Sequence, residues 1–209
     1  MSDAETRRGA VAEAIRAQRL VAIVRTSSPQ QAREAAGVLV MCGVDLIEVA
    51  LTTPDALEVV RELVDEVAGS VHIGVGTAVT VEEVRASARA GASFVVSPCT
   101  DRAAIRAAHD ADMFALPGAA TPTEIITAVA AGADMVKLFP ASLWGIGSFR
   151  HLRAPLPLVE LVPSGGVAIE DVPDWLAAGA VAVGVGSALT AGTEQDVRDR
   201  VTKLLARGG

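Results

Sequence analysis

The chain has 209 residues, of which 51% are hydrophobic and 21% are charged, and its formal net charge is −7. This length suffices for one domain with a sizeable core, and the composition is that of a globular rather than a disordered protein. The acidic balance, without any basic run, argues against nucleic acid or an anionic membrane surface as the partner. Aromatic residues make up only 3%, so platforms for base stacking are scarce.

The sequence also bears on location and metal binding. No apolar run approaches the roughly 20 residues of a membrane span. The first residues, MSDAETRRGAVAEAIRAQ, carry scattered charges and no apolar signal core, so we expect a cytoplasmic protein. Cys42 and Cys99 lack metal-ligand spacing, and we interpret both as buried thiols. The three histidines lie far apart in the sequence, and we expect surface or hydrogen-bonded side chains at His72, His109 and His151.

Short apolar runs rich in valine and isoleucine recur along the chain. They occupy residues 21–26, 46–51, 71–79, 93–98, 113–118, 135–140, 158–166 and 181–189. Segments with helical periodicity separate them, such as PQQAREAAGVLVMCG and TVEEVRASARAG. Near-continuous apolar strands that alternate with helices indicate a parallel sheet covered by helices.

Capping residues mark the ends of the predicted helices. Glycine follows four of them and suits a left-handed C-terminal cap. A hydroxyl residue followed by proline marks three starts. These positions are Gly43, Gly91, Gly132 and Gly179 at the ends, and Ser28-Pro29, Thr53-Pro54 and Thr121-Pro122 at the starts.

Eight strand–helix units without a linker predict one α/β domain over residues 1–209. We expect a (β/α)8 TIM barrel with an extra N-terminal helix. The alternative is an open doubly wound sheet. Such a sheet more naturally begins with a glycine-rich turn after its first strand, where this sequence reads RTSSP.

Apart from Glu160, three charged residues stand within these apolar runs. Active-site groups of such barrels lie at the carboxyl ends of the strands, and alternation sorts side chains into barrel-facing and helix-facing sets. Lys137, between two apolar residues, points into the barrel, because the opposite orientation would bury an unpaired cation. Glu160 lies earlier in its strand. We therefore expect Arg25, Glu48 and Lys137 to converge on one apolar cup.

A lysine in such a cup suits covalent chemistry with carbonyl compounds. Burial and a neighbouring cation disfavour a protonated amine, whereas a neighbouring carboxylate favours it. A neutral amine attacks carbonyl carbon and forms a Schiff base. The alternative is that Lys137 and Glu48 form a buried ion pair that only stabilises the barrel, although such pairs are weak stabilisers.

Turns of small residues follow the last two predicted strands. PSGGV follows the seventh and GVGSAL ends the eighth. Barrel enzymes often bind phosphate with these two loops and a helix N-terminus, where glycine permits a close approach of the backbone. We expect Gly165, Gly166, Gly186 and Ser187 to bind phosphate; the alternative is that they only form tight turns.

From about residue 12 to residue 190 the sequence resembles the 2-keto-3-deoxy-6-phosphogluconate / 2-keto-4-hydroxyglutarate aldolase family. The resemblance rests on VAIVR, GVDLIEVAL, IGVGTAV, FVVSP, LPGAATPTE, VKLFPA and PSGGV, in that order. It implies a small (β/α)8 barrel and a class I aldolase that uses no metal or other cofactor. It also implies a keto-acid sugar phosphate as substrate and a homotrimeric assembly.

The resemblance further implies a role for each site residue. Lys137 would be the Schiff-base lysine and Glu48 the proton-shuttling acid/base. Thr77 and Pro98 would line the pocket for the keto-acid end, with Thr77 on the carboxylate. The full set of implied substrate contacts is Arg25, Thr77, Pro98, Phe139, Gly165, Gly166, Gly186 and Ser187.

Two departures from the family pattern concern the substrate. Thr52 stands where the phosphogluconate branch usually has arginine, and LTTP is closer to a phosphogalactonate-like branch. Cys99 replaces a glycine after the fourth predicted strand.

The activity implied is cleavage of a 2-keto-3-deoxy-6-phosphosugar acid of either branch to pyruvate and glyceraldehyde 3-phosphate. Three alternatives are open. One is a 4-hydroxy-2-oxoglutarate aldolase giving pyruvate and glyoxylate. The others are a sugar-phosphate barrel enzyme without a covalent intermediate and a binding protein without catalysis.

Overall fold

A computed structural model describes residues 7–205, in which helices and strands alternate. The predicted domain also includes residues 1–6 and 206–209, which lie outside the described part. The strands are β1 (Leu20–Val24), β2 (Leu46–Ala50), β3 (His72–Gly76), β4 (Phe94–Val96), β5 (Phe114–Leu116), β6 (Gly118–Ala119), β7 (Val136–Leu138), β8 (Leu161–Pro163) and β9 (Val183–Val185). Each predicted apolar run overlaps at least one of them.

The helices fill the intervals between the strands. They are α1 (Arg7–Gln18), α2 (Pro29–Met41), α3 (Ala56–Val67), α4 (Val81–Arg89), α5 (Arg102–Asp110), α6 (Pro122–Ala130), α7 (Gly145–Arg153), α8 (Val172–Ala177), α9 (Ser187–Thr190) and α10 (Glu194–Leu205). Two short 3-10 helices, η2 (Ala141–Leu143) and η3 (Ile169–Asp171), precede α7 and α8.

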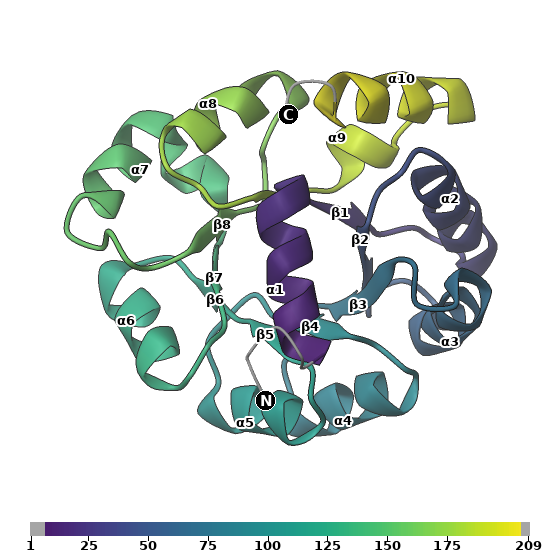
Figure 1. The fold of residues 1–209 in the computed structure, drawn as a ribbon, viewed down its shortest axis with the longest axis horizontal. Coiled ribbons are helices and arrows are strands. Elements are labelled where there is room, and N and C mark those ends of the chain that lie inside the picture. Colours follow the sequence, from purple (N-terminus) through teal and green to yellow (C-terminus); the bar gives the residue numbers. More distant parts are fainter. Residues whose placement is uncertain (1–6, 206–209) are drawn as a thin grey trace.

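The strands form curled parallel sheets in chain order. Six pair in the order β5-β4-β3-β2-β1-β9, and three pair in the order β6-β7-β8. An isolated parallel bridge between Ser164 and Gly184 connects β9 to the end of β8. The helices surround the strands, and α1 crosses the centre of the view (Figure 1). This sequential order differs from that of a doubly wound sheet, in which the strand order reverses at a switch point.

Most of the predicted helix caps are confirmed. Ser28 accepts a hydrogen bond from Gln31 N ahead of α2, and Thr121 forms a capping box with Glu124 ahead of α6. The four predicted C-terminal glycines all have positive φ, between 80° and 102°. The start predicted at Thr53-Pro54 is wrong, because α3 begins at Ala56.

Thr53 has another role in the structure. It is 2% exposed, and its Oγ1 accepts a hydrogen bond of 3.2 Å from the backbone N–H of Thr26. A hydroxyl residue followed by proline fits the sequence pattern of a helix N-terminus. Here, however, the hydroxyl of Thr53 accepts its hydrogen bond from the backbone of another loop and caps no helix.

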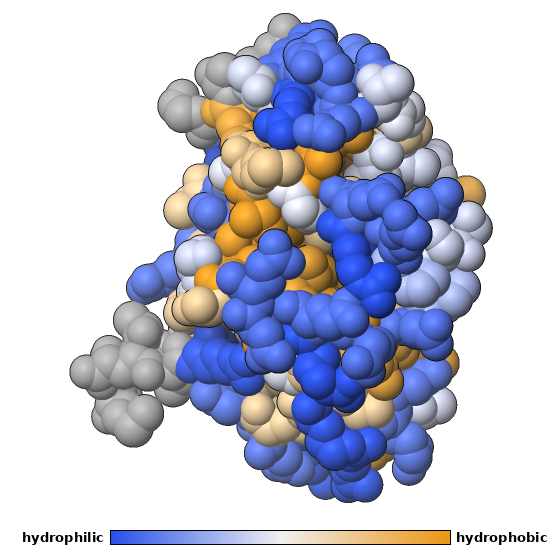
Figure 2. All heavy atoms as spheres, turned by 90° about the vertical axis from the view of Figure 1, so that its right-hand side faces the viewer, coloured by the Kyte–Doolittle hydropathy of each residue, from blue (hydrophilic) through white to orange (hydrophobic). Residues whose placement is uncertain are grey.

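Two apolar layers hold the fold together. The outer layer lies between the sheets and the surrounding helices. The inner layer lies within the curl of the strands and includes Val11 and Ile15 of α1, both 0% exposed. Seen from the side of α2, α3 and α10, hydrophobic side chains form a band between hydrophilic ones (Figure 2).

Ion pairs fasten α1 to the strands. Arg8 contacts Asp134, just before β7, at 2.5 Å, and Arg16 contacts Glu160, just before β8, at 2.7 Å. Glu160 was expected within its strand, but β8 begins one residue later. Together with Val11 and Ile15, these contacts place α1 against the amino ends of the strands, away from the ends at which active-site groups were predicted.

Candidate active site

Lys137 is the central residue of β7 and is 7% exposed. Its neighbours Val136 and Leu138 pack in the outer, helix-facing layer, so alternation turns Lys137 into the curl of the strands. The register pairs it with Gly118 of β6 and Val162 of β8. This is the orientation that the sequence predicts.

Glu48 lies in the middle of β2 and is 2% exposed. Its Oε2 is 4.0 Å from Nζ of Lys137. Its Oε1 is buried and has no hydrogen-bond partner among the described residues. A buried polar atom without a partner costs about 1–3 kcal/mol, and in a native fold such an atom points to a role in binding or proton transfer.

Arg25 only partly meets the expectation of a shared apolar cup. It directly follows β1 and is exposed, because the apolar strand ends before it. Its Nη2 donates a hydrogen bond of 3.2 Å to Oγ1 of Thr77, directly after β3. Thr77 has a φ of +66°, a left-handed conformation that is rare for a β-branched residue and that concentrates at functional sites.

A cavity of about 280 Å³ opens beside Lys137. Its charged lining side chains are Arg25 and Lys137, and both are basic, which suits an anionic ligand. Nζ of Lys137 lies 5.2 Å from the ring centroid of Phe139, within range of a cation–π contact. The lining residues are Ile23, Arg25, Lys137, Phe139, Ser164, Gly165, Gly166, Val167, Gly184, Gly186, Ser187 and Ala188.

The structure thus brings together most, but not all, of the predicted site. All four candidate phosphate ligands line the cavity. Gly165 and Gly166 have φ values of +84° and +81°, which favour glycine, and a Cβ on Gly165 would lie 2.7 Å from the ring of Phe139. Thr77 and Pro98 do not line the cavity; Thr77 is connected to it through Arg25.

Ser164 is a cavity residue that the sequence interpretation missed. It is 2% exposed and directly follows β8. A Cβ added to Gly184 would lie 2.7 Å from its Oγ, so the hydroxyl lies beside β9. The signal was present within PSGGV, because Ser164 stands two residues after the inward-facing Val162.

The remaining polar candidates lie elsewhere. Nε2 of His109 is 3.0 Å from Asp134, His151 is exposed, and burial lowers the pKa of His72. The expectation of two buried thiols is wrong, since Cys42 is half-buried and Cys99 is exposed. Among residues 7–205, no group of three metal-ligating side chains is placed to hold an ion, and no helix has the length and apolar character to cross a membrane.

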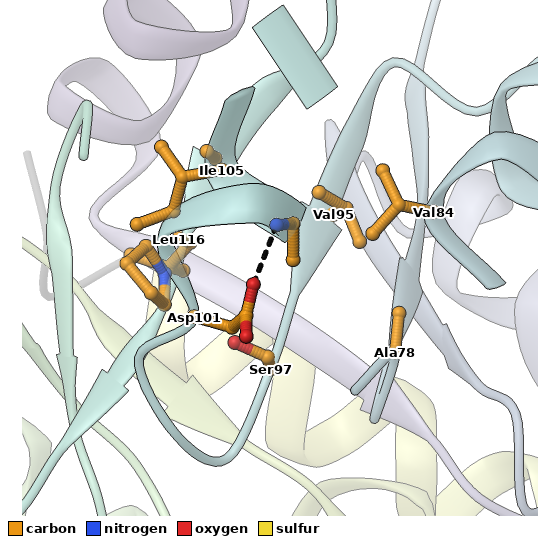
Figure 3. Close-up of a pocket in the computed structure, with 10 residues that line it drawn as sticks. Ala78, Val84, Val95, Ser97, Asp101, Ile105 and Leu116 are labelled. Atoms are coloured by element: carbon orange, nitrogen blue, oxygen red, sulfur yellow. Dashed lines mark hydrogen bonds between the residues drawn. The ribbon is translucent and has the colours of Figure 1, made fainter. Parts of the chain in front are cut away.

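A second cavity lies between α4, α5 and the sheet (Figure 3). Its volume of about 10 Å³ is roughly that of one water-sized probe, which is too small for a metabolite. Asp101 at its edge accepts a hydrogen bond of 2.7 Å from Ala104 N and caps α5. This cavity therefore belongs to the packing of the outer layer.

The comparisons with known proteins point to one family. The family model described as KDPG and KHG aldolase matches residues 11–204. A probable 2-dehydro-3-deoxy-6-phosphogalactonate aldolase of Rhizobium meliloti is 37% identical over 193 residues, which cover 90% of each chain. A 2-dehydro-3-deoxy-phosphogluconate aldolase of Pseudomonas aeruginosa is 33% identical over 164 residues, covering 78% of this chain and 74% of that one.

Solved structures show the same relationship. A structure described as native KDPGal superposes with a TM-score of 0.84 at 32% identity, covering 90% of this chain and 93% of the other. A KDPG aldolase of Legionella pneumophila, solved with pyruvate captured as a covalent carbinolamine, superposes with a TM-score of 0.79 at 25% identity, covering 93% and 95%. The chain belongs to the KDPG and KHG aldolase family.

Proposed function

We propose that the protein is a class I aldolase that cleaves a 2-keto-3-deoxy-6-phosphosugar acid to pyruvate and glyceraldehyde 3-phosphate. The observation that carries the proposal is the buried amine of Lys137, 4.0 Å from the buried carboxylate of Glu48 and beside a basic cavity. The relatives named as phosphogalactonate and phosphogluconate aldolases support it.

The first half of the reaction forms the imine. The neutral amine of Lys137 attacks C2 of the substrate, and the carbonyl oxygen takes up a proton to give a carbinolamine. Loss of water from this adduct gives an iminium ion. Glu48 carries the protons, since its Oε1 has no partner among the described residues and is free to exchange them.

The second half breaks the C3–C4 bond. Glu48 removes the proton from the C4 hydroxyl, directly or through water, and that carbon becomes the aldehyde of glyceraldehyde 3-phosphate. The bonding electrons pass to the iminium and produce an enamine. The enamine is protonated at C3, and water hydrolyses the resulting imine to release pyruvate and the free amine.

The other predicted residues bind the substrate in this proposal. Arg25 and Thr77 bind the carboxylate end, Pro98 lines that end, and Phe139 packs against the chain of the substrate. Gly165, Gly166, Gly186 and Ser187 receive the phosphate. Ser187 supports this role because it is the first residue of α9, where the backbone N–H has no partner within the helix.

We further propose the finer features of fold and assembly. With β5 and β6 counted as one strand, the two sheets form a closed (β/α)8 barrel, and α1 is an extra helix across its amino end. The bridge between Ser164 and Gly184 and the pairing of β6 with β7 support closure. A homotrimer, which rests on the family resemblance, and a cytoplasmic location, which rests on the sequence pattern described above, complete the proposal.

The test is pyruvate release from defined substrates. We expect turnover of one or both C4 epimers of the phosphorylated acid, with the phosphogalactonate type preferred because Thr52 replaces the usual arginine and a relative of that name is 37% identical. Release from 4-hydroxy-2-oxoglutarate alone would favour the hydroxyglutarate reaction instead. Binding of the phosphorylated acids without any pyruvate release would contradict the proposal.

A further inference from the structure

The barrel-facing side of β3 carries no side chain at two successive inward positions, Gly74 and Gly76. Glycine within a strand is unfavourable, because it packs poorly and loses more conformational entropy than other residues. Neither residue has the positive φ that favours glycine. The conformation of the backbone therefore does not explain why glycine stands at these two positions. The explanation must lie in the side chains that surround them.

The carboxylate of Glu48 lies in the space that a side chain at Gly76 would fill. A Cβ built on Gly76 would overlap Oε1 and would lie 2.5 Å from Cδ and 2.7 Å from Cγ. Real Cβ atoms do not approach other atoms this closely. Glu48 belongs to β2, which pairs with β3 so that Ala50 is level with Gly76, and its side chain extends along this neighbouring strand.

We infer that Gly76 is a positioning residue for the acid/base: the space left by its missing side chain sets the side chain of Glu48 beside Lys137. This inference rests on the proposed function. A methyl group at residue 76 would displace Cγ, Cδ and Oε1 of Glu48 together, and with them the 4.0 Å approach of Oε2 to Nζ of Lys137. Gly76 carries no side chain that could contact the substrate, so the loss should appear mainly in turnover and little in substrate binding.

Gly74 provides the matched control. It lies on the same strand and faces the same way, but a Cβ there would overlap the ring of Phe94, and the three nearest atoms all belong to that ring. G74A and G76A therefore make the same chemical change with comparable overpacking. Only in G76A are the nearest overlapping atoms those of the Glu48 side chain.

The experiment is a double-mutant cycle measured by turnover and by thermal unfolding at one protein concentration. We expect G76A to lower kcat by about 10²–10⁴-fold, the contribution of one acid/base group, with KM changed by less than about 3-fold. In an E48A background, where the overlapping atoms are absent, we expect G76A to cause no further loss of turnover. Its cost in melting temperature should also disappear.

G74A should lower the melting temperature in both the native and the E48A background, because the ring of Phe94 is present in both. If the cost of G76A in melting temperature is as large in E48A as in the native protein, the overlap is with other atoms and the inference is wrong. If the native protein cleaves no keto-deoxy acid, the proposed function fails, but coupling in melting temperature still reports the positioning.

Discussion

Lys137 has the central chemical role in the proposed mechanism. A substitution that keeps its charge but removes the nucleophilic amine separates these two properties. Lys137→Arg keeps a cation beside Glu48, but a guanidinium does not form an imine and stays protonated in proteins. We therefore expect the variant to fold and to lose pyruvate release to below detection. Steady-state kinetics on the phosphorylated acid checks this, with circular dichroism as the folding control. Retained cleavage would mean that Lys137 acts as a charge and not as a nucleophile.

Glu48 is predicted to transfer protons rather than to bind the substrate. Glu48→Gln keeps the shape of the side chain within its buried site and removes the titratable oxygen. We expect kcat to fall by about 10²–10⁴-fold, with some borohydride-trapped pyruvate adduct still formed on Lys137. Mass spectrometry of the trapped protein, alongside the kinetic measurement, separates the two steps. An unchanged turnover would remove Glu48 from the mechanism.

Alternation along a strand was enough to predict which way the buried charges point. Lys137 and Glu48 could be placed because their apolar neighbours need the helix-facing side. Arg25 and Thr53 could not, because both lie in loops beyond the strand ends, where periodicity stops. Their hydrogen bonds, to Thr77 and Thr26, connect segments that are distant in the sequence.

Among the elements, α1 is held in part by the half-buried carboxylate of Asp134, just before β7. Burial by itself raises the pKa of Asp134, but hydrogen bonds from His109, Arg8 and the backbone N–H of Ala115 outweigh it and hold that pKa below its usual value. A depressed pKa means that the ionised form stabilises the fold. This contribution is present above the unfolded value of about 3.9 and is lost as the pH falls through the folded pKa.

Asp134→Asn should therefore destabilise the protein in a pH-dependent way. We expect a loss of about 1.5–3 kcal/mol in the free energy of unfolding at pH 7, typical of a hydrogen bond to a charged group. The difference from the native protein should shrink below about pH 4. Urea denaturation at both pH values measures it, and Asp110→Asn, at an exposed position of α5, is the control. A difference that is constant with pH would contradict this account.

Local sequence signals predicted the strands and most helices. They did not predict how the two sheets meet. Hydrophobic runs located the strands, with β5 and β6 as one run, and capping residues located the starts of α2 and α6. The break between β5 and β6 and the single bridge at Ser164 depend on how the strands curl. That curl depends on the twist of the strands together with packing of the inner layer, and local sequence patterns do not encode where the sheets break.

For the whole molecule, the proposed trimer predicts a mass in solution three times that of the 21.4 kDa chain. Sedimentation equilibrium over a range of protein concentrations measures it. A single species of trimer mass is the expected result. A monomer that retains full turnover would contradict the proposed assembly while leaving the chemistry of Lys137 intact.

The most direct test of the account is covalent capture of pyruvate. The native protein is incubated with pyruvate and borohydride, and the modified peptide is mapped by mass spectrometry. The account predicts one reduced pyruvyl addition per chain, on Lys137, and none in the Lys137→Arg variant. Folded native protein that gains no addition, or that gains it only on Lys203, would show that the buried lysine forms no imine and would contradict the proposed mechanism.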